Sequence, residues 1–152
     1  MRLLPLTVTL CLAASNGPFI GVWRSEPDPY RHGRSSPVEL TFSSEGDSLT
    51  LRRESVTSTG EHRGSTFHYV FDGKYYPLEY PADAKHKTHV VMYRRIDERT
   101  LEYTIDHDNG MMHTTTRHTV SAAGRTITEA SSGADEKGQP IRLEIVFTKA
   151  QE

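Results

Sequence analysis

Alternation of apolar and polar residues is the dominant pattern of this chain from residue 16 onward. A period of two predicts β-strands with one buried face, and no window carries the period of 3.6 that predicts a helix. Turn-forming Gly, Asn, Asp and Ser residues separate the alternating runs. We therefore predict strands at residues 19–23, 38–43, 49–57, 61–71, 88–96, 101–107, 111–120, 126–132 and 141–148.

Consecutive strands joined by short turns favour an up-and-down barrel, because closing the sheet removes its exposed edges. The chain has 152 residues, the usual size of one domain, and shows no linker or internal repeat. We predict an all-β fold: a single antiparallel up-and-down β-barrel of eight or nine strands, formed by residues 16–152.

The turn at Asn109-Gly110 predicts the register of one hairpin, since both residues tolerate the positive φ of a type I′ turn. A two-residue loop there places Tyr103 opposite Thr116 and Glu102 opposite Arg117. The second pair is ionic and suits the solvent face. Tyr103 and Thr116 are therefore predicted to face the interior.

The turn at Glu98-Arg99 extends this ladder by one strand. A two-residue loop there sets Arg94 opposite Tyr103 and Met92 opposite Ile105. This register predicts that Arg94 and Met92 point into the barrel. A slip of one residue would send both side chains to the outer face.

A polar cluster inside the barrel follows, because a loop at Ala123-Gly124 brings His118 opposite Glu129 on the inner face that also holds Arg94. Buried charges need a partner, water or a ligand. Two interpretations are structural: an Arg94–Glu129 ion pair bridged by His118, or a register that is wrong by one residue. The functional interpretation is a polar anchor in the wall of a ligand cavity. The candidate ligand-binding residues are Met92, Arg94, Tyr103, Ile105, Met112, Thr116, His118 and Glu129.

The first fifteen residues have the pattern of a signal peptide. Arg2 gives a positive start, residues 3–14 form an apolar run, and small residues at its end offer a cleavage site. The run is too short for a stable membrane anchor, which needs about 20 apolar residues. We predict a signal peptide at 1–15 and a secreted or periplasmic protein with no membrane segment after processing; the alternative is a first buried strand or helix. Cys11 does not favour a lipoprotein, since a leucine precedes it where such sites have a small residue.

Motifs for catalysis, metals and nucleic acids are missing from the sequence. The net charge is −2 and basic residues are scattered singly, which argues against nucleic-acid binding. No nucleophile elbow, phosphate loop or metal-binding spacing of histidines occurs, although His86 and His89 could share an ion if the loop between them bends. We predict no enzyme activity, cofactor or metal. A general base formed by His118 and Glu129 is the weakest alternative, because no nucleophile or electrophile accompanies it.

The segment Phe19-Ile20-Gly21-Val22-Trp23-Arg24 resembles the Phe-x-Gly-x-Trp-Lys start of fatty-acid-binding proteins and the Gly-x-Trp start of lipocalins. Both belong to the calycin superfamily of ligand-binding barrels. The resemblance implies that Trp23 plugs the closed end of the barrel. Fatty-acid-binding proteins hold an anionic head with an Arg and a Tyr, which is a precedent for Arg94 and Tyr103 here.

A second resemblance covers nearly the whole chain after residue 15. It is to a group of exported bacterial proteins that begin, after a leader, with an Asn-Pro-Phe-x-Gly-Thr-Trp-like sequence. It implies export and a barrel, and it carries over no functional residue. The similar segments are Phe71-Asp72-Gly73-Lys74, Ile96-Asp97-Glu98-Arg99-Thr100-Leu101-Glu102, Val120-Ser121-Ala122-Ala123-Gly124-Arg125-Thr126 and Gly138-Gln139-Pro140.

The favoured functional prediction is a lipocalin-like protein that binds a small, mainly apolar ligand in the barrel, including an anionic amphiphile such as a fatty acid. The alternative is a filled barrel without a ligand, acting as a structural or protein-interaction module at the cell surface. A cavity of about 300 Å³ or more, lined by the candidate residues, would favour binding.

Overall fold

Ten antiparallel strands make up most of the described part of the chain. The computed structural model describes residues 16–26, 37–56, 62–78, 89–107, 113–135 and 137–151. The predicted signal peptide with Cys11, the turn at Asn109-Gly110, and Met112 lie outside these residues. The strands are β1 (Gly21–Ser25), β2 (Val38–Glu45), β3 (Ser48–Val56), β4 (His62–Tyr69), β5 (Tyr75–Pro77), β6 (His89–Asp97), β7 (Thr100–His107), β8 (His113–Val120), β9 (Thr126–Ala134) and β10 (Pro140–Lys149).

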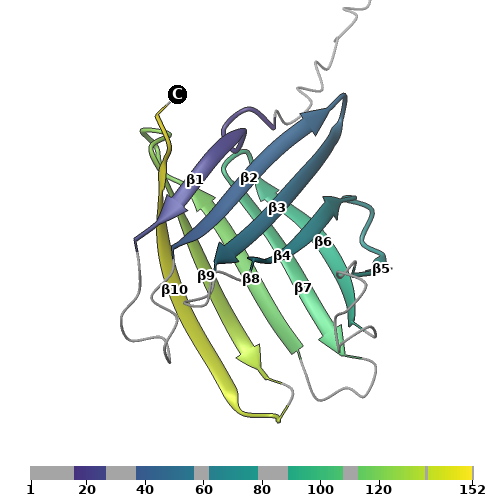
Figure 1. Cartoon of the computed structure of the whole chain (residues 1–152). Coiled ribbons are helices and arrows are strands. Elements are labelled where there is room, and N and C mark those ends of the chain that lie inside the picture. Colours follow the sequence, from purple (N-terminus) through teal and green to yellow (C-terminus); the bar gives the residue numbers. More distant parts are fainter. Residues whose placement is uncertain are drawn as a thin grey trace, which may run out of the picture.

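The strands form one curled sheet in the order β4-β3-β2-β1-β10-β9-β8-β7-β6-β5 (Figure 1). Strands that follow each other in the chain are paired, except β4 and β5, and β1 pairs with β10. The prediction of an all-β, antiparallel, up-and-down fold is therefore confirmed. The predicted closed barrel is wrong, because β4 and β5 are the two edges of the sheet and leave a half-barrel. The described residues include no helix of the length and apolarity needed to cross a bilayer.

The strand missing from the predicted count of eight or nine is β5. It has three residues, Tyr75–Pro77, and ends in a proline, which cannot donate to a sheet ladder. The turn before it is built by Asp72, whose Oδ1 accepts a hydrogen bond from the backbone N–H of Lys74 at 3.0 Å. Gly73 in this turn has φ +74°, a conformation that glycine adopts without strain. So short a strand carries too little alternation to be recognised from sequence.

The concave, inner face of the curled sheet holds the hydrophobic core. Alternate residues of each strand point to it, as the period of two requires. Trp23 is fully buried, and its Nε1–H donates a hydrogen bond to the Phe19 carbonyl at 2.8 Å. Phe67 and Tyr103 stack across the interior with ring centroids 4.8 Å apart. The core consists of Phe19, Trp23, Leu40, Phe42, Leu49, Leu51, Phe67, Tyr69, Leu78, Val91, Tyr93, Leu101, Tyr103, Val120, Ile127 and Phe147.

Two of the three predicted hairpin registers are confirmed. Strands β7 and β8 pair Tyr103 with Thr116, and strands β8 and β9 pair His118 with Glu129. All four side chains are buried on the inner face. The second hairpin turns at Gly124, whose φ of +68° explains why a glycine stands there.

The register predicted between β6 and β7 is wrong by one residue. The register shifts between Arg95 and Asp97, so that Ile96 is an extra residue on β6. Beyond this β-bulge Arg94 lies opposite Glu102, and Met92 no longer lies opposite Ile105. A shift of one residue reverses the two faces of a strand. Arg94 and Met92 are therefore not inner-face residues, contrary to the prediction, and the extra residue Ile96 is exposed.

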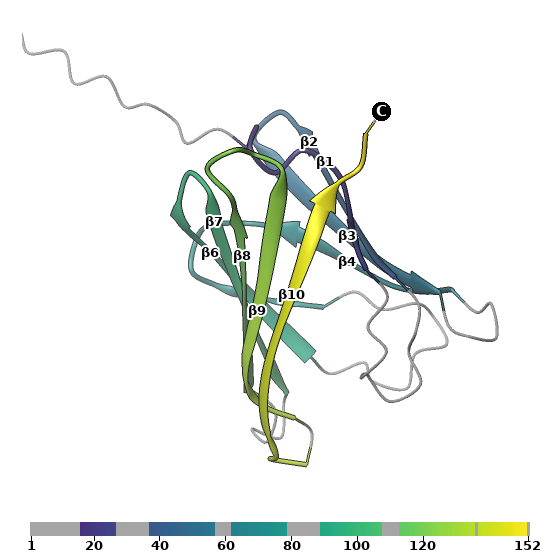
Figure 2. The ribbon, with the colours of Figure 1, turned by 90° about the vertical axis from the view of Figure 1, so that its left-hand side faces the viewer.

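The inner face extends beyond the core at one end of the sheet. Strand β10 pairs with β1 only through Phe147, Thr148 and Lys149, so the half of β10 that begins at Pro140 runs past β1 (Figure 2). Except for the buried Thr114 on β8, the larger inner-face side chains of this part are half-buried rather than buried. We name them the open-end surface: Ile105 on β7, Ser131 on β9, and Ile141, Leu143 and Ile145 on β10.

Candidate functional site

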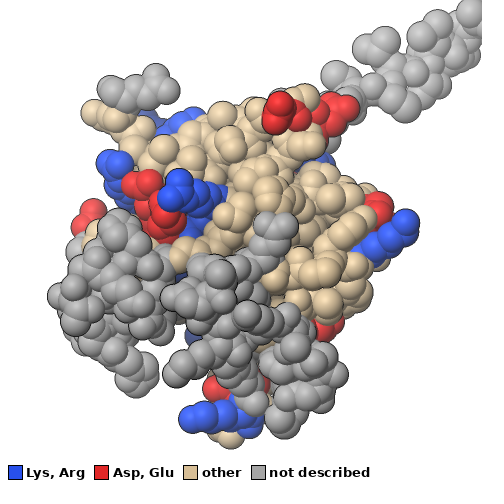
Figure 3. Space-filling model, turned by 45° about the vertical axis from the view of Figure 1, so that its right-hand side comes forward, with Lys and Arg blue, Asp and Glu red and all other residues tan. Residues whose placement is uncertain are grey.

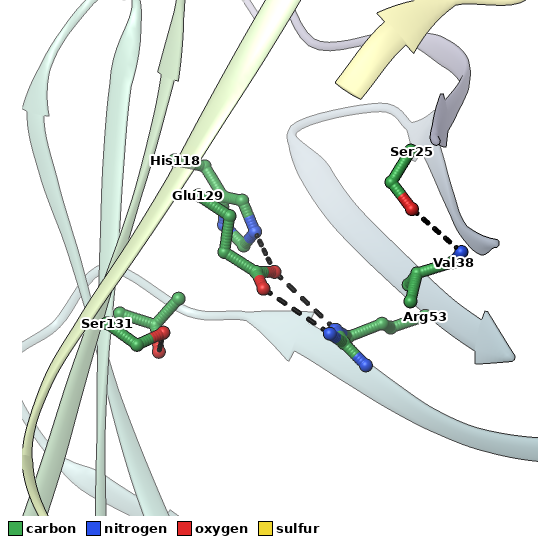
Figure 4. Close-up of polar contacts among 7 residues, drawn as sticks. Ser25, Val38, Arg53, His118, Glu129 and Ser131 are labelled. Atoms are coloured by element: carbon green, nitrogen blue, oxygen red, sulfur yellow. Dashed lines mark hydrogen bonds and ion pairs between the residues drawn. The ribbon is translucent and has the colours of Figure 1, made fainter. Parts of the chain in front are cut away.

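Five polar side chains meet inside the apolar core, and we name them the inner polar cluster: Arg53, Tyr103, Thr116, His118 and Glu129. Glu129 is at the centre, with Oε2 3.0 Å from His118 Nε2. Arg53 reaches it from β3, on the opposite side of the curled sheet (Figure 4). Its Nη2 donates to Glu129 Oε1 at 3.3 Å and its Nε to Oε2 at 3.5 Å.

Glu129 is ionised in this setting although only 3% of its side chain is exposed. Burial by itself would raise the pKa of the carboxyl group. The hydrogen bond from His118 and the charge of Arg53 outweigh this effect and lower the pKa of Glu129 to about 2. The same pairing raises the pKa of Arg53 despite the opposing effect of its burial. The two charges therefore compensate each other inside the core.

One ring nitrogen of His118 forms a hydrogen bond, and the other has no hydrogen-bond partner among the described residues. Because the Glu129 carboxylate can only accept, His118 Nε2 carries the hydrogen of their contact. Nδ1 is buried and has no hydrogen-bond partner among the described residues. A protonated ring would place a second N–H at this position with no acceptor.

Tyr103 and Thr116 complete the cluster on the side of the open end. Thr116 Oγ1 lies 2.8 Å from Ser131 Oγ, which links the cluster to the open-end surface. Burial raises the pKa of the Tyr103 hydroxyl, so that it stays protonated. The register also puts Leu143 beside Ser131 and Ile145 beside Glu129. Apolar side chains of β10 are thus direct neighbours of the polar cluster in the sheet.

The cation of this cluster is Arg53, whereas the sequence analysis assigned that role to Arg94. Leu49, Leu51 and Arg53 alternate along β3 on the inner face, and this alternation was the signal that could have found it. Of the eight predicted site residues, Tyr103, Thr116, His118 and Glu129 come together, Ile105 lies on the open-end surface, and Met112 lies outside the described residues. Met92 and Arg94 lie on the outer face.

On the outer face, Glu102 lies between two arginines, as its predicted orientation requires. Its Oε2 accepts hydrogen bonds from Arg117, the shorter at 2.6 Å, and its Oε1 is 3.8 Å from Arg94 Nη1. The arginine opposite Glu102 on β6 is Arg94, which the bulge turns to the outer face. The arginine side chains are 61% and 52% exposed, but that of Glu102 only 9%.

Glu102→Ala should lower the free energy of unfolding by only about 1 kcal/mol, near the upper end for surface ion pairs. Both arginines can turn into water once the carboxylate is removed, so no buried charge loses its partner. Urea unfolding of the wild type and the variant measures the difference. A loss of about 3 kcal/mol or more in the free energy of unfolding would contradict this expectation. It would mean that the ion pairs of Glu102 on the outer face stabilise the sheet as strongly as a buried ion pair does.

A groove of about 670 Å³ lies along β7 to β10, mostly on the outer face, and it also reaches Ser131, Ile141 and Leu143 of the open-end surface. Small side chains on β9 form its middle, and the charged residues of the neighbouring strands flank them. On another face of the molecule, Figure 3 shows Lys and Arg beside Asp and Glu rather than in a patch of one sign. The groove is lined by Glu102, Thr115, Arg117, Ala130, Ser131, Ser132, Pro140, Ile141, Arg142, Leu143 and Glu144.

Comparison with known proteins adds no assignment to this geometry. The chain matches no model of a protein family and no curated protein. Within the described ranges, no group of three or more His, Cys, Asp or Glu side chains is placed to hold a metal ion. The residues of the inner polar cluster and the open-end surface are therefore the basis for a functional proposal.

Proposed function

We propose that this chain is an exported protein that binds a small, mainly apolar molecule on the open-end surface, with the polar part of the molecule at the inner polar cluster. Export rests on the signal-peptide pattern of residues 1–15. Binding rests on the inner face of β7 to β10, where half-buried apolar side chains lie next to a buried polar group.

The observation that carries the proposal is the partial exposure of Arg53, which pairs with the buried Glu129. Its side chain is 27% exposed, whereas those of Glu129 and His118 are 3% and 0% exposed. Arg53 is therefore the member of the cluster that a bound molecule can contact. Mainly apolar walls with a few polar groups that orient the ligand are typical of small-molecule sites.

The contacts of Arg53 with Glu129 do not use all of its hydrogen-bond donors. A guanidinium carries five N–H donors, and the contacts to Glu129 involve Nε and Nη2. At 3.5 and 3.3 Å they are longer than charge-assisted hydrogen bonds, which measure about 2.7–2.9 Å. An acceptor atom of a ligand can thus bind Arg53 without displacing a tight ion pair.

Leu143→Glu should weaken the binding of an apolar probe at least tenfold, because it places a charge on the open-end surface. The probe is N-phenyl-1-naphthylamine, which is uncharged and fluoresces more strongly in apolar surroundings. A fluorescence titration of the purified protein with the probe gives the dissociation constant.

The matched control is Val146→Glu. Val146 lies on the same strand but on the outer face, where it is 53% exposed. This variant adds the same charge and should bind the probe like the wild type. The proposal is wrong if the wild type does not bind the probe, or if both variants weaken binding equally.

A protein-interaction module is a second candidate, favoured by the groove on the outer face. The groove is within the size range of binding sites, and its charges of both signs suit a polar partner surface. The aromatic packing of the core also agrees with a filled interior: the ring centroids of Tyr69 and Tyr93 are 4.7 Å apart. Absence of probe binding in the wild type would favour this function.

A further inference from the structure

The net charge of the inner polar cluster limits the chemistry of the ligand proposed above. Arg53 carries one positive charge and Glu129 one negative charge, held 3.3 Å apart. A proton on His118 Nδ1 would be buried with no acceptor among the described residues, so the charge of the cluster is that of the Arg53–Glu129 pair. Tyr103 and Thr116 are uncharged. The cluster as a whole is therefore neutral, while a cluster built on an unpaired arginine would be cationic.

We propose that the ligand is an uncharged amphiphile whose acceptor oxygen, from a hydroxyl, ether or carbonyl group, takes a hydrogen bond from Arg53. This inference rests on the proposed function and sharpens it, because the sequence alone left a fatty acid open. The apolar part of the ligand would lie along Leu143 and Ile145 on β10, which pair with Ser131 and Glu129 of β9.

An anionic head is disfavoured because Glu129 already neutralises the charge of Arg53. A second carboxylate on Arg53 would share one cation with Glu129, and two buried anions a few ångströms apart repel each other strongly. A cationic head is disfavoured too, because Arg53 already pairs with Glu129 and would repel a second cation there. A neutral acceptor meets neither penalty and still satisfies a donor of Arg53.

The test compares three ligands with one chain length: decanol, decanoate and decylammonium. Each displaces N-phenyl-1-naphthylamine from the full chain at neutral pH and below its critical micelle concentration. The wild type should bind decanol at least tenfold more tightly than either ion.

Two variants change the charge of the cluster and should change the preference with it. Glu129→Gln leaves Arg53 uncompensated, so the affinity for decanoate relative to decanol should rise at least tenfold. Arg53→Gln leaves Glu129 uncompensated and should favour decylammonium in the same way. The second variant keeps the test decisive if the first does not fold.

Glu102→Gln is the matched control, since it removes the same charge from the outer face. It should leave the decanoate-to-decanol ratio as in the wild type. The inference is overturned if the wild type prefers decanoate, or if the cluster variants leave the ratios unchanged. If the wild type binds neither the probe nor any of the three ligands, the proposed function itself fails.

Discussion

Glu129→Ala should destabilise the fold by about 3–5 kcal/mol, the range for breaking a buried ion pair by removing one partner. The carboxylate is the only group that links Arg53 to His118 in the cluster. Without it, His118 is left fully buried with neither nitrogen bonded to a described residue. Arg53 keeps its charge in a mostly buried position. Denaturant unfolding of the wild type and the variant measures the loss.

The double variant Arg53→Met/Glu129→Leu separates charge from packing. Apolar side chains in place of a buried ion pair are often tolerated, because the cost of desolvating the charges disappears with them. This variant should therefore be more stable than Glu129→Ala. If the single variant loses less than about 1 kcal/mol, as expected of Glu102→Ala, the inner polar cluster does not stabilise the core.

The sequence determined the faces of β7, β8 and β9 because three kinds of residue agreed there. Turn residues set the loop lengths, apolar residues marked one face, and the pair Glu102 and Arg117 marked the other. A slip of one residue would have buried these charges. His118 and Glu129 were consequently placed together correctly without any structural information.

The faces of β6 could not be predicted in the same way. Val91 and Tyr93 on one face are as apolar as Met92 on the other, so the pattern permits both registers. The choice depends on the extra residue at Ile96, and a bulge of this kind leaves no periodic signal. The bulge buries Tyr93, lets Arg94 pair with Glu102 on the outer face, and turns the half-buried Arg95 to the face of Leu101, where its guanidinium lies over the Phe71 ring.

Arg53 illustrates the limit of reasoning from neighbouring strands. Its place on the inner face follows from the alternation of β3, but its contact with Glu129 crosses the interior of the curled sheet. Cross-strand pairing relates only strands that are adjacent in a sheet. A contact between opposite walls depends on how strongly the sheet curls, and the sequence pattern does not encode that curvature.

Acidification should remove about 3 kcal/mol of stability through Glu129 alone. The carboxyl group has a pKa of about 2 in the folded protein, against its usual value of 4.5 in an unfolded chain. Because the folded pKa is the lower one, the unfolded chain binds the proton first as pH falls. The stabilisation is therefore complete above about pH 4.5 and is lost progressively as the pH falls toward 2.

Glu129→Gln makes this contribution measurable against the other carboxylates. Asp72, Asp97 and Asp106 also have lowered pKa values, but they are common to both proteins and cancel in the comparison. Urea unfolding at a series of pH values should give a wild-type advantage over the variant that is constant near neutral pH and shrinks between about pH 4.5 and 2. Parallel curves down to pH 2 would contradict the ion pair, because they would mean that Glu129 binds its proton equally well in the folded and unfolded chain.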